Sequence, residues 1–463
     1  MLRHRRLALL FALGALLLGL VAAGAAGAAP AAPSAAGAPS AAPPPGGTPV
    51  ITGLAGAFFF ALGDDGALYT YDGGSGDTEV YPPRPDTPPA PENPGPPQPL
   101  VRGLTGRVLR VAPDGTQRVV AAGLPSYQGY GGATGMALAH GALWALFSPS
   151  MAAYYGAAPY PAEGHLARID LATGAVAPVA DLAAYEREHN PDGSDVNPNP
   201  YGLAAGPDGA LYVADAGAND LLRVDPATGA IGVVAVFPPL PATAPNPLLD
   251  GRPATQAVPT GVAVAPGGGF YVANLPGAAG APPPGSGRVV HVAPDGTVSA
   301  VARGFTFATG VAVGPDGRVY VAELVGGFGP PAAPGGPPTM LPGRVSRLLP
   351  DGGAEVVVDG LDTPNGIAFD RAGALYVATG VASFGPPPPS PAGAILRFDA
   401  VGTPTSPSPS PAAPSPSSAP MPGLPNTGAG GAAAGPAPAL PLGLGLALFL
   451  GGGLARRWRA RRT

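Results

Sequence analysis

The chain of 463 residues contains no cysteine and no lysine, so all 24 of its basic residues are arginine. Without cysteine it has no disulfide framework, no thiolate zinc site and no cysteine nucleophile. Packing and hydrogen bonds must therefore stabilise whatever part of it folds. The sequence also shows no pair of histidines at metal-ligand spacing, no Ser/His/Asp order, no nucleophile elbow and no glycine-rich phosphate loop.

Acidic residues are absent from both ends, because residues 1–48 and 401–463 hold no Asp or Glu. These ends hold eight of the arginines, so residues 49–400 carry 16 Arg against all 29 acids, a formal charge of −13. A surface for nucleic acid needs an excess of positive charge, so we expect no nucleic-acid partner. The balance suits a soluble exported body and is compatible with cation binding.

The first 28 residues have the order of a secretory signal peptide. Three arginines precede an apolar run from Leu7 to about Ala23, and the small residues Ala26-Gly27-Ala28 follow. We expect cleavage after residue 28 and a disordered linker over 29–48. An uncleaved N-terminal anchor is the alternative.

Residues 424–463 resemble the cell-wall sorting signal that sortases read. A pentapeptide is followed by an apolar segment over 440–455 and a basic tail; the pentapeptide is Leu424, Pro425, Asn426, Thr427 and Gly428. The resemblance implies that a sortase is a partner, which cuts after Thr427 and joins its carboxyl group to wall material. A single-pass membrane anchor is the alternative. Both predict an exported body held at the cell surface beyond a Ser/Pro-rich stalk over 401–423.

Between these ends one pattern of two short apolar runs joined by a turn occurs six times. An aromatic residue ends the second run of each copy; these are Tyr69, Trp144, Tyr212, Tyr271, Tyr320 and Tyr376. Pro-Asp-Gly is the commonest turn, because Pro fixes φ near −65° and Gly accepts a positive φ. A second pair of short strands follows every copy, as in "GRVLRVAPDG". Four strands in each of six repeats predict an all-β six-bladed β-propeller over 49–400.

The sixth copy lacks its outer strand, whereas "PVITGL" (49–54) precedes the first copy and has the composition of that strand. We therefore expect the N-terminal strand to complete the last blade and close the ring, which removes an open sheet edge. A stack of independent hairpins is the alternative. In the propeller the Pro-rich segments and long inserts leave one face, and the tight turns occupy the other.

The half-motif "GLAAGPDGALYVADAGANDLLRVD" is similar to an NHL repeat. With its flanks, over 181–238, it resembles the ScyD/ScyE family of secreted six-bladed propellers, and the likeness extends more generally over about 50–400. The resemblance implies the fold and export. It implies no particular reaction.

Polar residues follow the second strand at the same position of several blades, namely Asp215, Asn274, Glu323 and Thr379. A shared blade position forms a ring around the axis, so Asp215, Asn274 and Glu323 are candidate ligands for a hard cation such as Ca²⁺. The alternative is that they cap turns at strand ends. The insert "DGSDVNPNP" adds the candidates Asp195 and Asn199, with Asp192 and Asn197, in a spacing that lacks the Gly and Glu of an EF-hand.

Asn365 in "PNGIAF" resembles the channel Asn of gluconolactonase-like lactonases, which hold a divalent metal with Glu, Asn and Asp. The early Glu-Gly-Pro element of that family is missing, and Asn365 as a turn residue is the alternative. Three functions stay open. The first is a non-enzymatic propeller that binds a ligand or partner through its loop-rich face; the others are a metal-dependent lactonase-like hydrolase and a structural cell-surface component.

Overall fold

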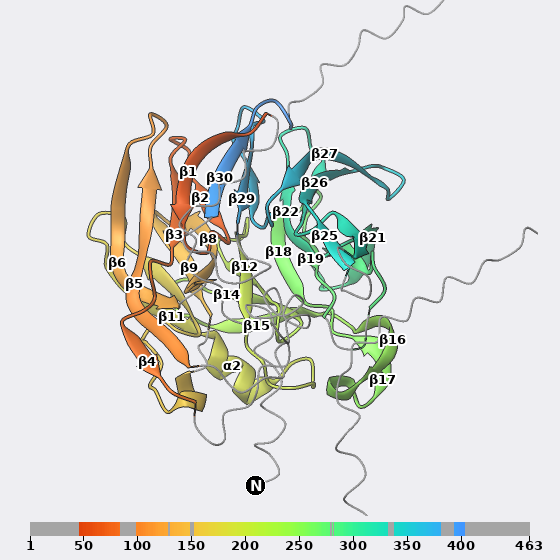
Figure 1. Ribbon diagram of the computed structural model, residues 1–463, viewed down its shortest axis with the longest axis horizontal. Coiled ribbons are helices and arrows are strands. Elements are labelled where there is room, and N and C mark those ends of the chain that lie inside the picture. The colour runs from red at the N-terminus through yellow and green to blue at the C-terminus, as the bar shows by residue number, and fades with distance from the viewer. Residues whose placement is uncertain are drawn as a thin grey trace, which may run out of the picture. The chain divides into compact units, whose positions relative to one another are not determined.

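The folded body consists of antiparallel sheets packed face to face in sequence order (Figure 1). The computed structural model describes residues 46–83, 99–127, 130–148, 152–277, 280, 282–331, 338–380 and 393–402. In this part of the chain six sheets have four or more strands, and two further sheets are small hairpins. The six-bladed all-β propeller predicted from the repeats is therefore confirmed.

The first three blades follow one another from residue 60 to residue 236. Blade 1 contains β2 (Phe60–Leu62), β3 (Leu68–Asp72), β5 (Leu100–Val111) and β6 (Gln117–Tyr127), with β4 (Glu79–Tyr81) and β7 (Tyr130–Gly131) at its sides. Blade 2 contains β8 (Ala133–Ala139), β9 (Ala142–Phe147), β10 (His165–Ile169) and β11 (Val176–Asp181). Blade 3 contains β12 (Pro200–Ala205), β13 (Leu211–Asp215), β14 (Asp220–Val224) and β15 (Ile231–Val236).

The other three blades repeat this plan, and the last one takes its outer strand from the start of the body. Blade 4 contains β18 (Pro259–Val264), β19 (Phe270–Asn274), β20 (Gly287–Val292) and β21 (Val298–Phe305). Blade 5 contains β22 (Ala308–Val313), β23 (Val319–Glu323), β26 (Gly343–Leu348) and β27 (Ala354–Leu361). Blade 6 contains β28 (Ile367–Phe369), β29 (Leu375–Thr379), β30 (Gly393–Phe398) and β1 (Thr48–Leu54).

The ring closes through the N-terminal strand. β1 pairs antiparallel with β30, with Ile51 opposite Ile395 and Leu54 opposite Gly393. The inner strands contact one another in order, and β28 of the last blade contacts β2 of the first. The predicted closure by residues 49–54 is confirmed, with β1 beginning one residue earlier.

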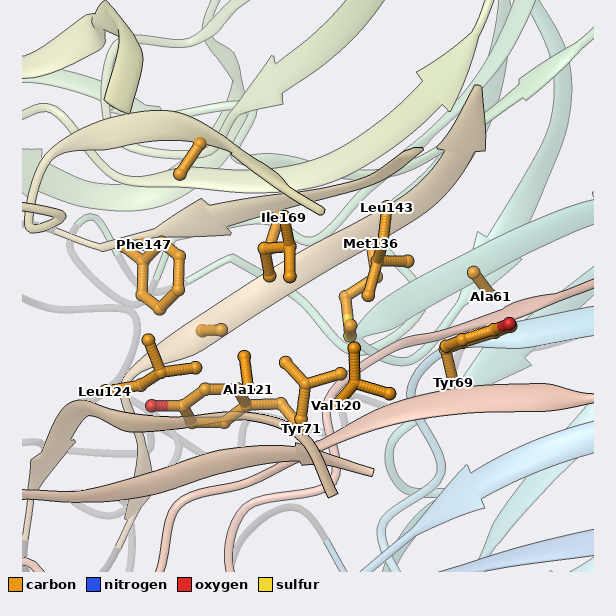
Figure 2. Packing of buried hydrophobic residues seen from close by; sticks show 14 of the residues in the cluster. Ala61, Tyr69, Tyr71, Val120, Ala121, Leu124, Met136, Leu143, Phe147 and Ile169 are labelled. Carbon is orange, nitrogen blue, oxygen red and sulfur yellow. The ribbon is translucent and has the colours of Figure 1, made fainter. Parts of the chain in front are cut away.

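Large apolar side chains fill the space between neighbouring blades. Figure 2 shows this between blades 1 and 2, where Tyr71 meets Phe147 edge-on with 6.0 Å between the ring centroids. All six residues of β9 are buried, because a strand between two blades has a neighbour on both faces. The repeated aromatic also packs between blades, as Tyr212 does against Phe270 with 4.0 Å between centroids.

The Pro-Asp-Gly turns tie three strands together. In blade 3 the Asp208 carboxylate accepts hydrogen bonds from the Ala210 backbone N–H (3.2 Å), the Tyr212 hydroxyl (3.1 Å) and the Arg223 Nε (2.8 Å). Gly209 completes the turn with φ +78°. These connections are short, so they leave little room for a site on their face of the propeller.

The connections at the opposite strand ends carry the added elements and form the loop-rich face. These elements are η3 (Ala152–Tyr155), α2 (Leu182–His189), η4 (Pro247–Leu249), the β16 (Leu240–Asn246) and β17 (Arg252–Thr255) hairpin, and the β24 (Gly327–Pro331) and β25 (Pro338–Leu341) hairpin. The Pro-rich segment after β23, expected as a loop, thus forms a hairpin in part. Pro is accepted there because a two-stranded edge leaves N–H positions unpaired.

The predicted signal peptide, most of the 29–48 linker, the 401–423 stalk beyond residue 402 and the 424–463 sorting signal lie outside the described residues. The chain divides into two units, Met1–Ser406 and Pro407–Thr463, and the propeller belongs to the first. Within the described ranges, none of the helices has the length and apolar character needed to cross a membrane.

Candidate functional site

In three blades the polar residue that ends the second strand is opposite an arginine of the third strand. The pairs are Asp72 with Arg107 (2.9 Å), Asn274 with Arg288 (3.0 Å) and Glu323 with Arg344 (2.7 Å). The Glu323 side chain is 1% exposed and also accepts the Thr306 backbone N–H at 2.8 Å. The Glu323 carboxylate is therefore satisfied within its own blade, whereas Asn274 Nδ2 and Arg288 Nη2 have no hydrogen-bond partner among the described residues.

This pairing bears directly on the predicted calcium ring. Asn274 and Glu323 each bind an arginine of their own blade, and the Thr379 hydroxyl donates to the Ala394 carbonyl at 3.4 Å. Among the residues the structure describes, no three His, Asp or Glu side chains lie together in a metal-ligating arrangement. No hydrogen bond or ion pair among the described residues joins Asp215, Asn274 and Glu323 to one another. The calcium ring therefore stays a prediction.

Blade 3 departs from the pattern. Asp215 lies opposite Asp220, because this repeat has Asn219-Asp220 where other repeats have Gly-Arg. One Asp215 oxygen accepts the backbone N–H groups of Asn199 (2.7 Å), Gly217 (3.1 Å) and Ala218 (3.1 Å), whereas its Oδ2 has no hydrogen bond. Asp220 is fully buried, and neither of its carboxylate oxygens has a partner.

Helix α2 adds a third buried carboxylate to this place. Asp181 caps the helix by accepting the Ala184 N–H at 2.7 Å, and Asn190 ends it with φ +40°. The spacing of Leu182, Ala183 and Glu186 puts them on the buried face of the helix. Glu186 is 2% exposed; the Asn197 N–H turns toward its carboxylate, but neither oxygen receives a hydrogen bond of regular geometry.

The loop after α2 is folded by its own polar side chains. Asp192 accepts the Ser194 N–H at 2.7 Å and the Asn219 Nδ2 at 2.9 Å, and Asp195 accepts the Gln256 Nε2 at 3.0 Å. Asp195 Oδ2 and the Asn197 Oδ1 have no partner. The acidic cluster of blade 3, as we call it, consists of Glu186, Asp192, Asp195, Asn197, Asp215 and Asp220.

Burial and mutual repulsion raise the pKa values of four acids of this cluster, namely Glu186, Asp195, Asp215 and Asp220. Burial, with the charges of Asp215, Asp192 and Asp195, raises the pKa of Glu186 to about 8. Burial raises the pKa of Asp195 to about 6 and that of Asp215 to about 6. Burial and the neighbouring acids raise the pKa of Asp220 well above its usual range.

A cavity of about 760 Å³ lies next to the cluster on the loop-rich face. Its polar side is formed by Asp192, Ser194, Asp195 and Gln256, and its apolar side by Phe237 and Leu248 with neighbouring prolines. The volume suits a small molecule, and polar and apolar groups share the wall about equally. Rigid strands of two blades position these loops.

The central channel has a different character. Asn365 is fully buried; its Nδ2 donates to the Tyr201 hydroxyl, and its Oδ1 has no partner. Phe58 and Phe59 pack edge-on against the Tyr201 ring, with centroid distances of 5.9 Å and 5.5 Å. Burial raises the pKa of Tyr201. Among the described residues, no hydrogen bond or ion pair brings a carboxylate to Asn365.

The threonines at the position of Asn365 in other blades serve the ring itself. The Thr134, Thr260 and Thr309 hydroxyls donate across the blade boundary to the carbonyls of Pro200 (2.8 Å), Ala308 (2.9 Å) and Pro364 (3.0 Å).

Among solved structures, the chain is similar to a gluconolactonase from Xanthomonas campestris, with 14% identity over 79% of this chain and 98% of that one (TM-score 0.45). It is also similar to the PQQ-bound aldose sugar dehydrogenase from Streptomyces coelicolor, with 16% identity over 77% and 99% (TM-score 0.45). A virginiamycin B lyase from Staphylococcus aureus matches with 11% identity over 76% and 97% (TM-score 0.38). No family model and no curated protein matches the chain.

Proposed function

We propose that this chain is an exported, surface-tethered propeller of the ScyD/ScyE type, which binds a small ligand on its loop-rich face without transforming it. The observation that carries the proposal is the cavity of about 760 Å³ between the 192–196 loop, the end of β15 and the β16–β17 hairpin. Backbone turns fill the other face. The ligand site is therefore placed where the inserts gather.

Charge around the cavity defines the class of ligand. Asp192, Asp195 and Asp250 line it, and Arg252 is the basic residue among the lining side chains. The body as a whole carries −13 over residues 49–400. A negative potential of this kind repels anions, so the proposed ligand is neutral and polar or positively charged.

Filling the cavity should abolish binding. We expect Leu248→Trp to lower affinity at least about tenfold for whichever ligand binds, since the added ring occupies space that the ligand needs. The measurement is isothermal titration calorimetry with a panel of neutral mono- and disaccharides, polyols and spermidine.

The matched control is Val356→Trp, which adds the same ring at a residue 48% exposed on β27 of blade 5. This variant should bind like the parent chain. If no member of the panel binds the parent chain, or if Leu248→Trp binds as tightly as the control, the site is not in this cavity. In that event a purely structural role at the cell surface is favoured.

A second candidate is the metal-dependent lactonase-like hydrolase. The observation in its favour is the unpartnered Oδ1 of fully buried Asn365 in the channel. Hydrolysis of gluconolactone that depends on added Ca²⁺ or Mn²⁺ and disappears in Asn365→Ala would favour this candidate. Hydrolysis that survives Asn365→Ala would exclude the channel as its site.

Surface attachment is the other part of the proposal. Export and sorting predict a mature chain from about Ala29 to Thr427, with the Thr427 carboxyl amide-linked to wall material where a sortase is present. Intact-mass measurement on wall-released protein should find Gly428 to Thr463 removed. A mature chain that still carries those residues would support the membrane-anchor alternative.

A further inference from the structure

The acidic cluster of blade 3 is a place where like charges are buried together. In the blades described above, the residue opposite the strand-end acid or amide is arginine; in blade 3 it is Asp220. None of the ion pairs among the described residues includes a member of the cluster. A buried carboxylate without a counter-charge is strongly unfavourable, so these acids must bind either protons or a cation from outside the chain.

The unused hydrogen-bonding capacity of the cluster points the same way. Four side chains, each at least nine-tenths buried, have six oxygens without a partner: both of Glu186, both of Asp220, Asp215 Oδ2 and Asn197 Oδ1. Native proteins leave few buried polar atoms unsatisfied, and one place seldom holds six of them. Glu186 and Asp215 lie near enough to Asp220 for their charges to raise its pKa, and Asn197 follows in the loop after α2.

The donor set selects the kind of cation. All six atoms are carboxylate or amide oxygens, and the described part of the cluster includes no thiolate or imidazole. Hard cations prefer oxygen ligands, and Ca²⁺ takes six to eight of them in flexible geometry, whereas Mg²⁺ demands a near-ideal octahedron. A set drawn from a helix, a loop and two strands suits the more permissive ion.

We propose that the acidic cluster of blade 3 is a Ca²⁺ site, with ligands from α2, the 192–197 loop, β13 and β14; these are Glu186, Asn197, Asp215 and Asp220. No three acids of the described residues lie in ligating geometry, so Ca²⁺ binding requires side chains to change rotamer. Glu186 has three rotatable side-chain bonds, and the Asp220 oxygens have no hydrogen bonds to break. The ion would fasten α2 and the following loop to blade 3. Because Asp192 and Asp195 belong to the cavity wall, it would also set the shape of the cavity.

The first test is Ca²⁺ binding by the purified full chain at neutral pH. We expect one Ca²⁺ per chain by calorimetry. We also expect the melting temperature to rise by about 4 °C at a hundredfold excess over Kd relative to EDTA, because the ion binds only the folded chain. Mg²⁺ should raise it less. A parent chain that shows neither binding nor a Ca²⁺-dependent shift would overturn the proposal.

The variant is Glu186→Gln with Asp220→Asn, which keeps the side-chain shapes and removes two of the charged ligands. Calcium affinity should fall at least about tenfold. The variant should fold, since it removes repulsion, and in EDTA it should melt no lower than the parent chain. The matched control is Glu188→Gln with Asp114→Asn, which removes two exposed carboxylates outside the cluster and the cavity. Equal Ca²⁺ affinity in the two double variants would refute the site.

Terbium luminescence locates the ion independently. Burial, together with the nearby charges of Asp220 and Glu186, raises the pKa of Tyr185 on α2. Tb³⁺, a Ca²⁺ mimic, should show tyrosine-sensitised emission that Ca²⁺ displaces and that falls in Tyr185→Phe, while Ca²⁺ affinity stays unchanged. Emission unaffected by Tyr185→Phe and by the cluster variant would place the ion elsewhere. The sugar, polyol and spermidine titrations test the ligand cavity, and the Ca²⁺ and Tb³⁺ measurements test the metal site. Either proposal can therefore fail without the other.

Discussion

Deleting residues 48–54 should lower the melting temperature of the protein by about 5–10 °C. β1 buries Ile51 and Leu54, which are 4% and 2% exposed, and it pairs with β30 along its length. Two buried aliphatic side chains stabilise by roughly 1.5–3 kcal/mol each, and lost strand pairing adds to this. A destabilisation of about 5 kcal/mol corresponds to that shift for a body of this size. Thermal unfolding followed by circular dichroism measures it.

The control is deletion of residues 84–98, which includes none of the described strands. It should change the melting temperature by no more than about 2 °C, because loop length has a small effect on closure entropy. A synthetic peptide of residues 46–56, added in trans, should restore part of the loss by pairing with β30. Equal melting temperatures for the two deletions would argue against ring closure by β1.

The fold could be predicted from the sequence because its determinants are local and repeated. Each Pro-Asp-Gly turn fixes a hairpin. The alternation of apolar and small residues along a strand determines which side chains face each neighbouring blade. The closing strand at 49–54 was also predictable, since the last repeat visibly lacks one strand. The β24–β25 hairpin was not, because Pro-rich composition favours a loop and only pairing with a partner strand changes that.

The candidate site depends on which side chain lies opposite which, and blade position alone does not determine that. Asn274 and Glu323 share a position with Asp215, but their arginine partners come from the next strand. Asn219-Asp220, which replaces the Gly-Arg of blades 1, 4 and 5, is visible in the aligned repeats and would have marked blade 3 as the repeat with an acid at this position. The burial of Glu186 could not be seen, since it depends on how a short helix in an insert docks on the sheet.

The arginine partners should matter greatly for stability. We expect Arg344→Ala to destabilise the protein by about 3 kcal/mol, the lower end of the range for breaking a buried ion pair, because Arg344 itself is partly exposed. The substitution leaves the Glu323 carboxylate, 1% exposed, without its counter-charge. Urea unfolding gives the free-energy difference, with unchanged m values as the sign that the native fold is kept.

Two further variants separate this effect from the general loss of an arginine. Arg371→Ala removes the partner of Asp64, and both side chains of that pair are more than four-fifths exposed, so its effect should be about 0.5 kcal/mol or less. Adding Glu323→Gln to Arg344→Ala should recover part of the loss, since the buried charge is then gone while the Thr306 N–H keeps an acceptor. If Arg344→Ala and Arg371→Ala destabilise equally, the blade-internal pair does not stabilise the propeller. Recovery in the double variant would identify the uncompensated charge of Glu323 as the cause of the destabilisation. Blade 3 presents the same problem, because Asp215 and Asp220 are buried there without an arginine partner.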